Sequence, residues 1–348
     1  MFEKAALSDL TGFYFGNAQN ELTGTGCTVV LCPEGAVCGV DVRGAAPATR
    51  ETDLLKPEKT VQRVNAVVLS GGSAFGLVSS SGVMSYLAKK QIGLRVGKAV
   101  VPIVVGASLF DLNVGENSYP DEACGYEACV NAMSLNAEFV QGNVGAGCGA
   151  SSAKLLGEDL AMKTGLGYHV CKHGEVVVAA VVAVNALGSV RDCSGSWIAG
   201  PVNKHGEFLD GFSAMQEFVT GSMSSKSGQD ELIKDEEFAH GIFQNIAPSS
   251  NTTLGVIITN AELTKANATH ISCVAHDAYA RSIYPVHTNM DGDAIFTMAH
   301  GCVKANVDAL GMMACEAMQQ AIQKSVVSSK SAFGLMAACD AIAVGTSK

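Results

Sequence analysis

The distribution of apolar residues along the chain predicts short strands and longer helices. Continuous apolar runs are typical of strands that are buried on both faces. Such runs occur at residues 28–32, 66–69, 93–96, 100–105, 176–184, 254–259 and 294–298. Alanine-rich segments with helical periodicity occupy residues 73–90, 123–133, 151–156, 263–283 and 303–324. Because strands cluster in the middle and helices lie toward both ends, we expect a layered α/β fold with a mixed sheet covered by helices.

The segment 221–250 interrupts this pattern. It is polar and charged, with Gly, Ser and Pro at its edges, and we interpret it as a surface excursion or linker with one short helix around residues 230–243. The residues Asn251, Thr252 and Thr253 follow directly and lead into the apolar run 254–259. A loop that tolerates cutting, joined to a strand that retains the new terminus, is what an internal processing site requires.

Composition narrows the possible classes of protein. Hydrophobic residues make up 48% of the 348 residues and charged residues only 16%, which favours an enzyme with a large core over a disordered chain. The net charge is −10 and Lys and Arg form no block, so nucleic acid is not an expected partner. The apolar runs are too short to span a bilayer and no secretory signal is evident, so we expect no membrane association.

The twelve cysteines lack the paired CxxC spacing of zinc sites and of redox motifs. Most of them stand among apolar residues. The pattern therefore predicts a reduced, cytoplasmic protein with small buried thiols rather than a disulfide scaffold.

Thr252 is the first candidate for chemistry. A threonine hydroxyl needs a base close by, and an α-amine freed by cleavage of the Asn251–Thr252 bond would supply one, with an unperturbed pKa of about 7.7–8.0. Attack of the hydroxyl on the Asn251 carbonyl would give an ester that water then opens. The same three residues also fit a glycosylation sequon, a helix cap or a turn.

Asp291 and Asp293 stand on either side of Gly292, at the entry to the apolar run 294–298. Carboxylates at positions i and i+2 of a strand face the same side, and a threonine terminus offers a hydroxyl and an ammonium to both. The alternatives are a calcium loop or a capped turn, although the further acidic ligands of an EF-hand are missing.

Two glycine-rich segments, 70–76 and 142–150, each precede a predicted helix. The first lacks the residues of a nucleotide-binding loop, so tight packing is favoured over phosphate binding. Backbone N–H groups of the second could line a substrate pocket or an oxyanion site. Cys148 lies in this loop, where packing is favoured over a role as nucleophile.

Together these motifs resemble the peptidase family of the L-aminopeptidase/D-amino-acid esterase type, which also holds the β-peptidyl aminopeptidases and the 6-aminohexanoate-oligomer (nylon oligomer) hydrolase. The resemblance runs nearly end to end. It is carried by GTGCTVVL (24–31), VDVRGAAPATRETDLL (40–55), NAVVLSGGSAFGL (65–77), VPIVVGASLFDLNVG (101–115), GNVGAGCGA (142–150), VVAVNALGSV (181–190), NTTLGVIITNA (251–261) and PVHTNMDGDAIF (285–296).

The resemblance implies an αββα-type sandwich that cuts itself and then acts as an N-terminal-nucleophile hydrolase. A single domain, residues 1–348, would yield fragments 1–251 and 252–348. The pair Asn251–Thr252 and the two aspartates, 39 and 41 residues further on, look most like the nylon-oligomer hydrolase branch. The family also implies a homo-oligomer, often a tetramer of cleaved pairs, with no cofactor and no metal.

Three further site residues follow from the resemblance alone. Asn185 and Lys163 match positions that bind substrate or polarise its carbonyl group, and Tyr126 is a looser match to a tyrosine with that role. The implied activity is hydrolysis of short peptides or ω-amino-acid amides through an acyl-enzyme on Thr252. The alternatives are an acyltransferase of the ornithine acetyltransferase type with the same nucleophile, and a metabolite-binding protein that uses the loop 70–76.

Overall fold

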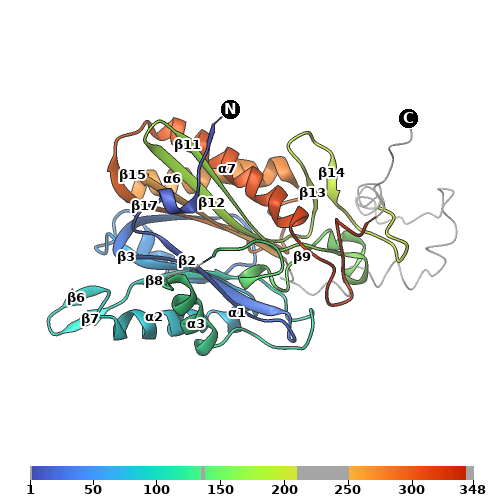
Figure 1. The fold of residues 1–348 in the computed structure, drawn as a ribbon, viewed down its shortest axis with the longest axis horizontal. Coiled ribbons are helices and arrows are strands. Elements are labelled where there is room, and N and C mark those ends of the chain that lie inside the picture. The colour runs from blue at the N-terminus through green and yellow to red at the C-terminus, as the bar shows by residue number, and fades with distance from the viewer. Residues whose placement is uncertain (1, 135–137, 210–250, 342–348) are drawn as a thin grey trace.

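The computed structural model describes residues 2–134, 138–209 and 251–341, and the predicted linker 221–250 with its short helix lies outside them. The chain forms four layers, with two helices on the outside of each of two stacked sheets (Figure 1). The expected layered α/β sandwich is therefore confirmed.

The first sheet carries the strand that begins at Thr252. Its order is β1 (Glu3–Lys4), β11 (Leu166–His173), β12 (Val176–Asn185), β15 (Thr252–Ala261), β17 (Ala294–Val303) and the second half of β3 (Thr25–Val42). Strand β15 pairs antiparallel with β12 and parallel with β17, so the sheet is mixed as expected.

Strand β3 is 18 residues long and connects the two sheets. Residues 37–42 pair with β17, whereas residues 25–31 pair with β2 (Tyr14–Asn20) and β5 (Val64–Ser70) in the second sheet. Strand β5 continues this sheet in parallel to β8 (Val104–Ser108), which pairs with β4 (Ala48–Arg50).

Three apolar clusters separate the four layers, and side chains alternate between them as the period of two requires. On β12, Val181 and Ala183 face the second sheet, whereas Val182 and Val184 face the helices α6 (Lys265–Ser282) and α7 (Val307–Val327). On β5, Val67 faces the first sheet, and the opposite face packs on α2 (Ser79–Lys89) and α3 (Glu122–Ala132). Burial on both faces explains the unbroken apolar runs in the sequence.

Several predicted elements differ from the observed ones. The segment 73–90 forms two helices, α1 (Ser73–Gly76) and α2, because the side chains of Ser70 and Ser79 hydrogen-bond to the carbonyl of Gly76. The run 100–105 is divided at Pro102 between β7 (Ala99–Val101) and β8. The run 93–96 contains β6 (Leu94–Val96), which pairs with β7 in a separate hairpin.

The helix predicted at 151–156 is wrong. Ser151–Ser152 form strand β9, Ala153 has a left-handed backbone with φ of 62°, and Lys154–Leu156 form a 3₁₀ turn. Helix α7 begins at Val307 because Asn306 caps it by accepting a hydrogen bond from the N–H of Ala309. The remaining strands are β10 (Met162–Lys163), β13 (Ser189–Arg191), β14 (Trp197–Ala199), β16 (Ile283–Tyr284) and β18 (Met336–Ala337). Further 3₁₀ turns are Leu7–Asp9, Asp53–Leu55, Gly145–Gly147 and Glu158–Leu160.

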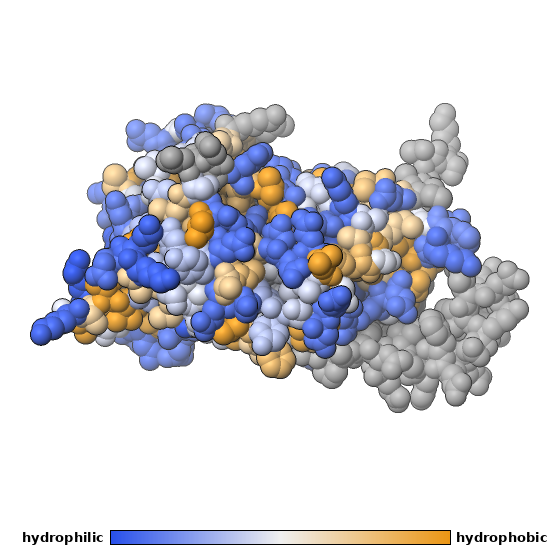
Figure 2. All heavy atoms as spheres, turned by 60° about the horizontal axis from the view of Figure 1, so that its bottom comes forward, coloured by the Kyte–Doolittle hydropathy of each residue, from blue (hydrophilic) through white to orange (hydrophobic). Residues whose placement is uncertain are grey.

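The surface mixes polar and apolar residues. On the face drawn in Figure 2, hydrophilic side chains are interspersed with hydrophobic ones. Within the described ranges, no helix is both long enough and apolar enough to cross a membrane.

Candidate functional site

Thr252 is the first residue of β15 and lies between two strands that bring different chemistry. Its register partner on β12 is Asn185, and the preceding residue, Asn251, forms an isolated parallel bridge with Asp291, three residues before β17. Thr252 is buried but lines a small cavity with Ser73, Ser108 and Phe110 and with the apolar segment Ala46, Pro47 and Ala48. The structure therefore brings Thr252, Asn185, Asp291 and Asp293 to one end of the first sheet.

The peptide bond before Thr252 is held by two hydrogen bonds. The Thr252 hydroxyl donates to the carbonyl oxygen of Asn251, and the N–H of Gly292 donates to the same oxygen at 3.0 Å. A side chain on Gly292 would not fit, because its Cβ would lie 2.7 Å from the Thr252 hydroxyl oxygen and 2.6 Å from the Ala46 carbonyl oxygen. The hydroxyl and the polarised carbonyl are thus assembled side by side.

The two aspartates are buried and have different partners. Asp293 accepts hydrogen bonds from the N–H of Thr253 at 2.7 Å and from the backbone and ring nitrogens of His287 at 3.2 and 2.7 Å. Asp291 accepts hydrogen bonds from the hydroxyl and the N–H of Thr288, at 2.6 and 2.9 Å. Burial, with the nearby charge of Asp293, raises the pKa of Asp291 to about 6.

Protein donors already form hydrogen bonds with the carboxylates of Asp291 and Asp293. No group of three or more His, Cys, Asp and Glu side chains within residues 2–134, 138–209 and 251–341 is arranged to hold a metal ion. The calcium-loop interpretation of Asp291 and Asp293 therefore has no support from the described residues.

The side chain of Asn185 is fixed from three directions. Its oxygen accepts hydrogen bonds from the N–H of Ser151 at 3.1 Å and from Lys154 Nζ at 2.8 Å, and its amide nitrogen donates to the Phe110 carbonyl at 2.8 Å. Lys154 is buried, which lowers its pKa to about 8. The sequence analysis did not single out Lys154, because the wrongly predicted helix at 151–156 hid its position.

Lys163 is also fully buried, but it lies beneath the glycine-rich loop 142–150. Its ammonium donates to the carbonyl oxygens of Gly147, Ala150 and Thr164, at 3.2, 2.9 and 2.5 Å, which accounts for its three hydrogens. Burial lowers its pKa to about 7. These contacts show that Lys163 supports the loop, and contact with a substrate remains a prediction.

The structure does not bring Tyr126 to Thr252. Tyr126 lies on α3 in the outer helical layer, where its ring packs edge-on against Tyr86 at 5.2 Å and lies under the ammonium of Lys89 at 4.6 Å. Its sequence motif carried no information on which layer the helix would join. The described contacts of Tyr126 are packing contacts, and a role at the site remains a prediction.

The two glycine-rich loops have structural roles. In the first, the N–H of Gly72 donates to the buried carboxylate of Asp111 at 2.6 Å, so an acidic group stands where a phosphate would have to bind. In the second, burial raises the pKa of the Cys148 thiol to about 11, which leaves it protonated and unreactive near neutral pH. Both observations agree with the packing roles expected for these loops.

This chain is similar to known proteins over most of its length. The sequence pattern of peptidase family S58 matches residues 5–338. An uncharacterized aminopeptidase of Mycobacterium leprae is 34% identical over 341 residues, which cover 90% of this chain and 85% of that protein. A 6-aminohexanoate-oligomer endohydrolase of Kocuria sp. is 28% identical over 331 residues, covering 90% and 84%.

Solved structures show the same fold at low sequence identity. A β-aminopeptidase of Burkholderia sp. superposes with a TM-score of 0.63 at 15% identity, over 94% of this chain and 89% of that one. The L-aminopeptidase D-Ala-esterase/amidase of Ochrobactrum anthropi, described as a variant of the N-terminal-nucleophile (Ntn) hydrolase fold, has a TM-score of 0.62 at 15% identity over the same shares. The chain therefore belongs to peptidase family S58, whose members are hydrolytic enzymes, and it shares its fold with a variant of the Ntn hydrolase fold.

Proposed function

We propose that the chain cuts itself between Asn251 and Thr252 and then hydrolyses amides with Thr252 as its N-terminal nucleophile. The observation that carries this proposal is the pair of hydrogen bonds on the Asn251 carbonyl oxygen, from the Thr252 hydroxyl and the N–H of Gly292. The Gly292 N–H would stabilise the negative charge that develops on this oxygen when the hydroxyl attacks.

The self-cleavage step is an N-to-O acyl shift. The Thr252 hydroxyl oxygen bonds to the Asn251 carbonyl carbon, and the bond from that carbon to the Thr252 nitrogen breaks as the nitrogen gains a proton. Water then opens the ester, which leaves a carboxylate on Asn251 and a free amine on Thr252. The products are the predicted fragments 1–251 and 252–348 of one domain.

The new amine serves as the base in turnover, since its ordinary pKa of about 8 suits proton transfer near neutral pH. Asp291 and Asp293 flank the terminus and orient the hydroxyl and the ammonium. Asn185, held by Lys154, faces Thr252 across the β12–β15 pair and donates to the substrate oxyanion once its amide is released from Phe110. The acyl-enzyme is then hydrolysed by water without a cofactor.

The substrates we propose are short peptides or ω-amino-acid amides. The relatives named aminopeptidase and 6-aminohexanoate-oligomer endohydrolase support this class. The cavity at Thr252 is lined by Pro47 and Phe110 together with the hydroxyl groups of Ser73 and Ser108. A second cavity that shares Phe110 is lined by three carboxylates, Asp111, Glu158 and Asp159, and by one ammonium, that of Lys154. An apolar chain that ends in an ammonium matches this combination of walls and charges.

The proposal also includes a cytoplasmic location and a homo-oligomer of cleaved pairs. All twelve cysteines are free thiols, which suits a reducing compartment. Gel filtration with light scattering on the purified protein would test the oligomer, and a mass equal to one cleaved pair would contradict it.

Denaturing electrophoresis with intact-mass measurement tests the central claim. We expect two fragments from the wild-type chain, one uncut chain from Thr252→Ala, and two fragments again from Thr252→Ser. The purified proteins are then assayed on alanine p-nitroanilide, β-alanine p-nitroanilide and a 6-aminohexanoate trimer. An intact wild-type chain that hydrolyses any of them would overturn the mechanism, and transfer of the acyl group to an added amine in preference to water would support the acyltransferase alternative.

A further inference from the structure

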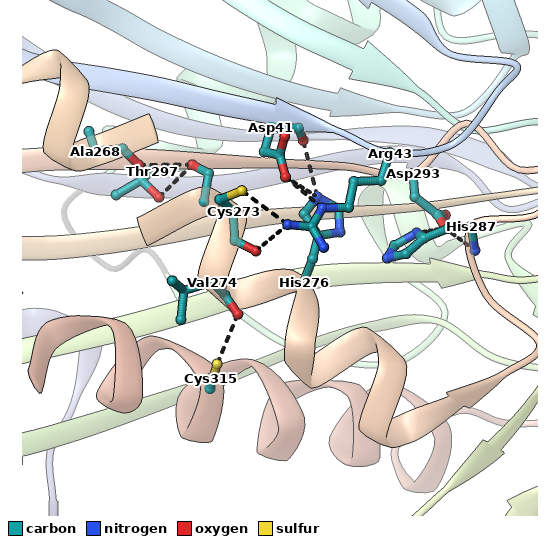
Figure 3. Close-up of polar contacts among 11 residues, drawn as sticks. Asp41, Arg43, Ala268, Cys273, Val274, His276, His287, Asp293, Thr297 and Cys315 are labelled. Atoms are coloured by element: carbon teal, nitrogen blue, oxygen red, sulfur yellow. Dashed lines mark hydrogen bonds and ion pairs between the residues drawn. The ribbon is translucent and has the colours of Figure 1, made fainter. Parts of the chain in front are cut away.

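A cluster of aromatic and imidazole rings lies directly behind the two aspartates and has no role in the mechanism above. His287, between β16 and β17, is in ring contact with His276 and Tyr279 of α6. Figure 3 shows His287 together with His276 and Asp293. His287 is also four residues before Asp291, in the segment 285–296.

His287 makes two contacts with the same carboxylate oxygen of Asp293, one from its ring and one from its backbone. Ring atom Nδ1 lies 2.7 Å from Asp293 Oδ2, and the backbone N–H of His287 donates to the same oxygen at 3.2 Å. Because a carboxylate oxygen accepts, Nδ1 carries the hydrogen. Among the described residues, His287 is the one basic side chain within ion-pair distance of Asp293.

The other carboxylate oxygen of Asp293 faces the nucleophile strand. Oδ1 accepts the N–H of Thr253 at 2.7 Å, one residue after Thr252. Asp293 is fully buried, so its carboxylate depends on these protein donors for the hydrogen bonds that water would otherwise supply. Loss of the His287 ring donor would leave Oδ2 with the backbone N–H of residue 287 as its remaining donor from this residue, and the carboxylate would be freer to rotate.

The His287 ring is itself held in place. His276 packs against it edge-on, with ring centroids 4.8 Å apart and planes at 72°, and Tyr279 lies at 6.0 Å. His276 is anchored in turn, because its Nε2 lies 3.1 Å from the carbonyl oxygen of Asp41 on β3. Burial lowers the pKa of His276 to about 4, so this ring stays neutral and does not compete for the carboxylate.

The backbone conformation of His287 is a second indication that surrounding contacts fix this residue. Its φ of 57° lies in the left-handed region, which is uncommon for residues other than glycine and asparagine and costs energy unless surrounding contacts fix it. This conformation lets the backbone N–H and the ring of one residue bond to the same oxygen.

From this geometry we infer that His287 is a positioning residue, which holds Asp293 in the orientation required for self-cleavage and turnover at Thr252. The inference rests on the proposed function, because it gives Asp293 a partner in the same reaction. His287 acts through Asp293 and does not contact the reacting atoms.

Two substitutions separate hydrogen bonding from backbone conformation. His287→Asn keeps a donor close to the position of Nδ1, and asparagine tolerates the left-handed backbone. His287→Gly tolerates that backbone as well and keeps the backbone N–H, but it has no side-chain donor. His300→Asn is the control, since His300 lies at the far end of β17 and contacts the Gly35 carbonyl oxygen at 3.2 Å.

The experiment measures the self-cleavage rate of freshly translated full-length chains by denaturing electrophoresis, normalised to the folded fraction found by gel filtration. We expect His287→Asn and His300→Asn to cleave within about threefold of wild type and His287→Gly to be slower by about 10²-fold, as a misplaced reacting geometry produces. In turnover, kcat should fall in His287→Gly with KM unchanged. In an Asp293→Asn background, His287→Gly should add no further loss, because both changes break one pair.

The outcomes that overturn the inference are distinct from those that overturn the proposed function. A wild-type chain that never cleaves removes the proposed function, and the inference with it. A wild-type chain that cleaves, together with a His287→Gly chain that cleaves equally fast, refutes the inference alone. Equal losses in His287→Asn and His287→Gly, or additive losses with Asp293→Asn, would refute it as well by assigning His287 a merely structural role.

Discussion

The two strands beside Thr252 differ in the chemistry that they bring to it. On the β17 side stand the carboxylates Asp291 and Asp293, which accept hydrogen bonds from Thr253, His287 and Thr288. On the β12 side stands the amide of Asn185, which is held by the ammonium of Lys154. Hydrogen-bond acceptors therefore flank Thr252 on one side, and an amide and a cation flank it on the other.

This difference matches the needs of acyl transfer. The acidic side can orient a hydroxyl and an ammonium, whereas the amide and the cation can stabilise an oxyanion. The Gly292 N–H is the exception, because it lies on the acidic side and donates to the Asn251 carbonyl. In the proposed self-cleavage, the donor would thus come from the segment just before β17, and we expect the β12 side to matter more in turnover.

The largest effect is expected on the acidic side. Asp293→Asn should slow self-cleavage on the order of 10³-fold, because the amide cannot accept from Thr253 and His287 with the strength of a carboxylate. A time course of fragment appearance on denaturing gels measures this. Cleavage at the wild-type rate would remove Asp293 from the mechanism.

Lys154→Met tests the β12 side and should lower kcat by about 10²-fold, because Asn185 loses the group that orients its amide. Self-cleavage should fall much less than turnover, since its carbonyl has the Gly292 donor. Steady-state kinetics on the substrate found for the wild type, beside a cleavage time course, checks both rates. Equal losses in the self-cleavage rate and in kcat would contradict the expectation that the β12 side acts mainly in turnover.

Lys163→Met is the matched control for Lys154, since both are buried lysines. It should destabilise the fold by about 1–3 kcal/mol, because three carbonyl oxygens lose their donor. Activity per folded molecule should stay closer to wild type than in Lys154→Met. Urea unfolding with parallel kinetics measures both quantities, and a loss of kcat without a loss of stability would return Lys163 to the catalytic group.

The pH dependence gives a smaller effect. The pKa of Asp291 is raised to about 6, so its carboxylate forms as pH rises through 6, and the self-cleavage rate should rise over the same range. Stability should move in the opposite direction. The folded chain binds this proton more tightly than the unfolded chain, so Asp291 contributes less to stability as pH rises from about 4 to 6. A rate profile of Asp291→Asn with the same rise near pH 6 would contradict the assignment.

The smallest expected change concerns the stability contribution of Lys163. Its pKa is lowered to about 7, so the folded chain loses the proton that the unfolded chain keeps up to its ordinary pKa near 10.5. Stability should therefore rise with pH across this window, and Lys163→Met should abolish that part of the rise. Melting temperatures of both chains at pH 7 and 9 measure the difference, and parallel curves would contradict it.

Part of this enzyme is determined by local sequence. The runs 176–184 and 254–259 are largely apolar on both faces, which is typical of buried strands, and they form β12 and β15 at the centre of the first sheet. The change from a polar segment to an apolar strand marked Thr252, and the spacing of Asp291 and Asp293 marked the start of β17. These features depend on residues that are close together in the chain.

Tertiary structure alone decided which distant side chains meet. Lys154 and Lys163 are nine residues apart and equally buried, yet one reaches Asn185 and the other a ring of carbonyl oxygens, because a left-handed residue at Ala153 turns the chain between β9 and Lys154. Tyr126 joined the outer layer because α3 packs on α2, and Asp293 met the N–H of Thr253 because β17 pairs with β15. Local sequence sets strands and turns, but only the packing of the layers sets the partners of a buried charge.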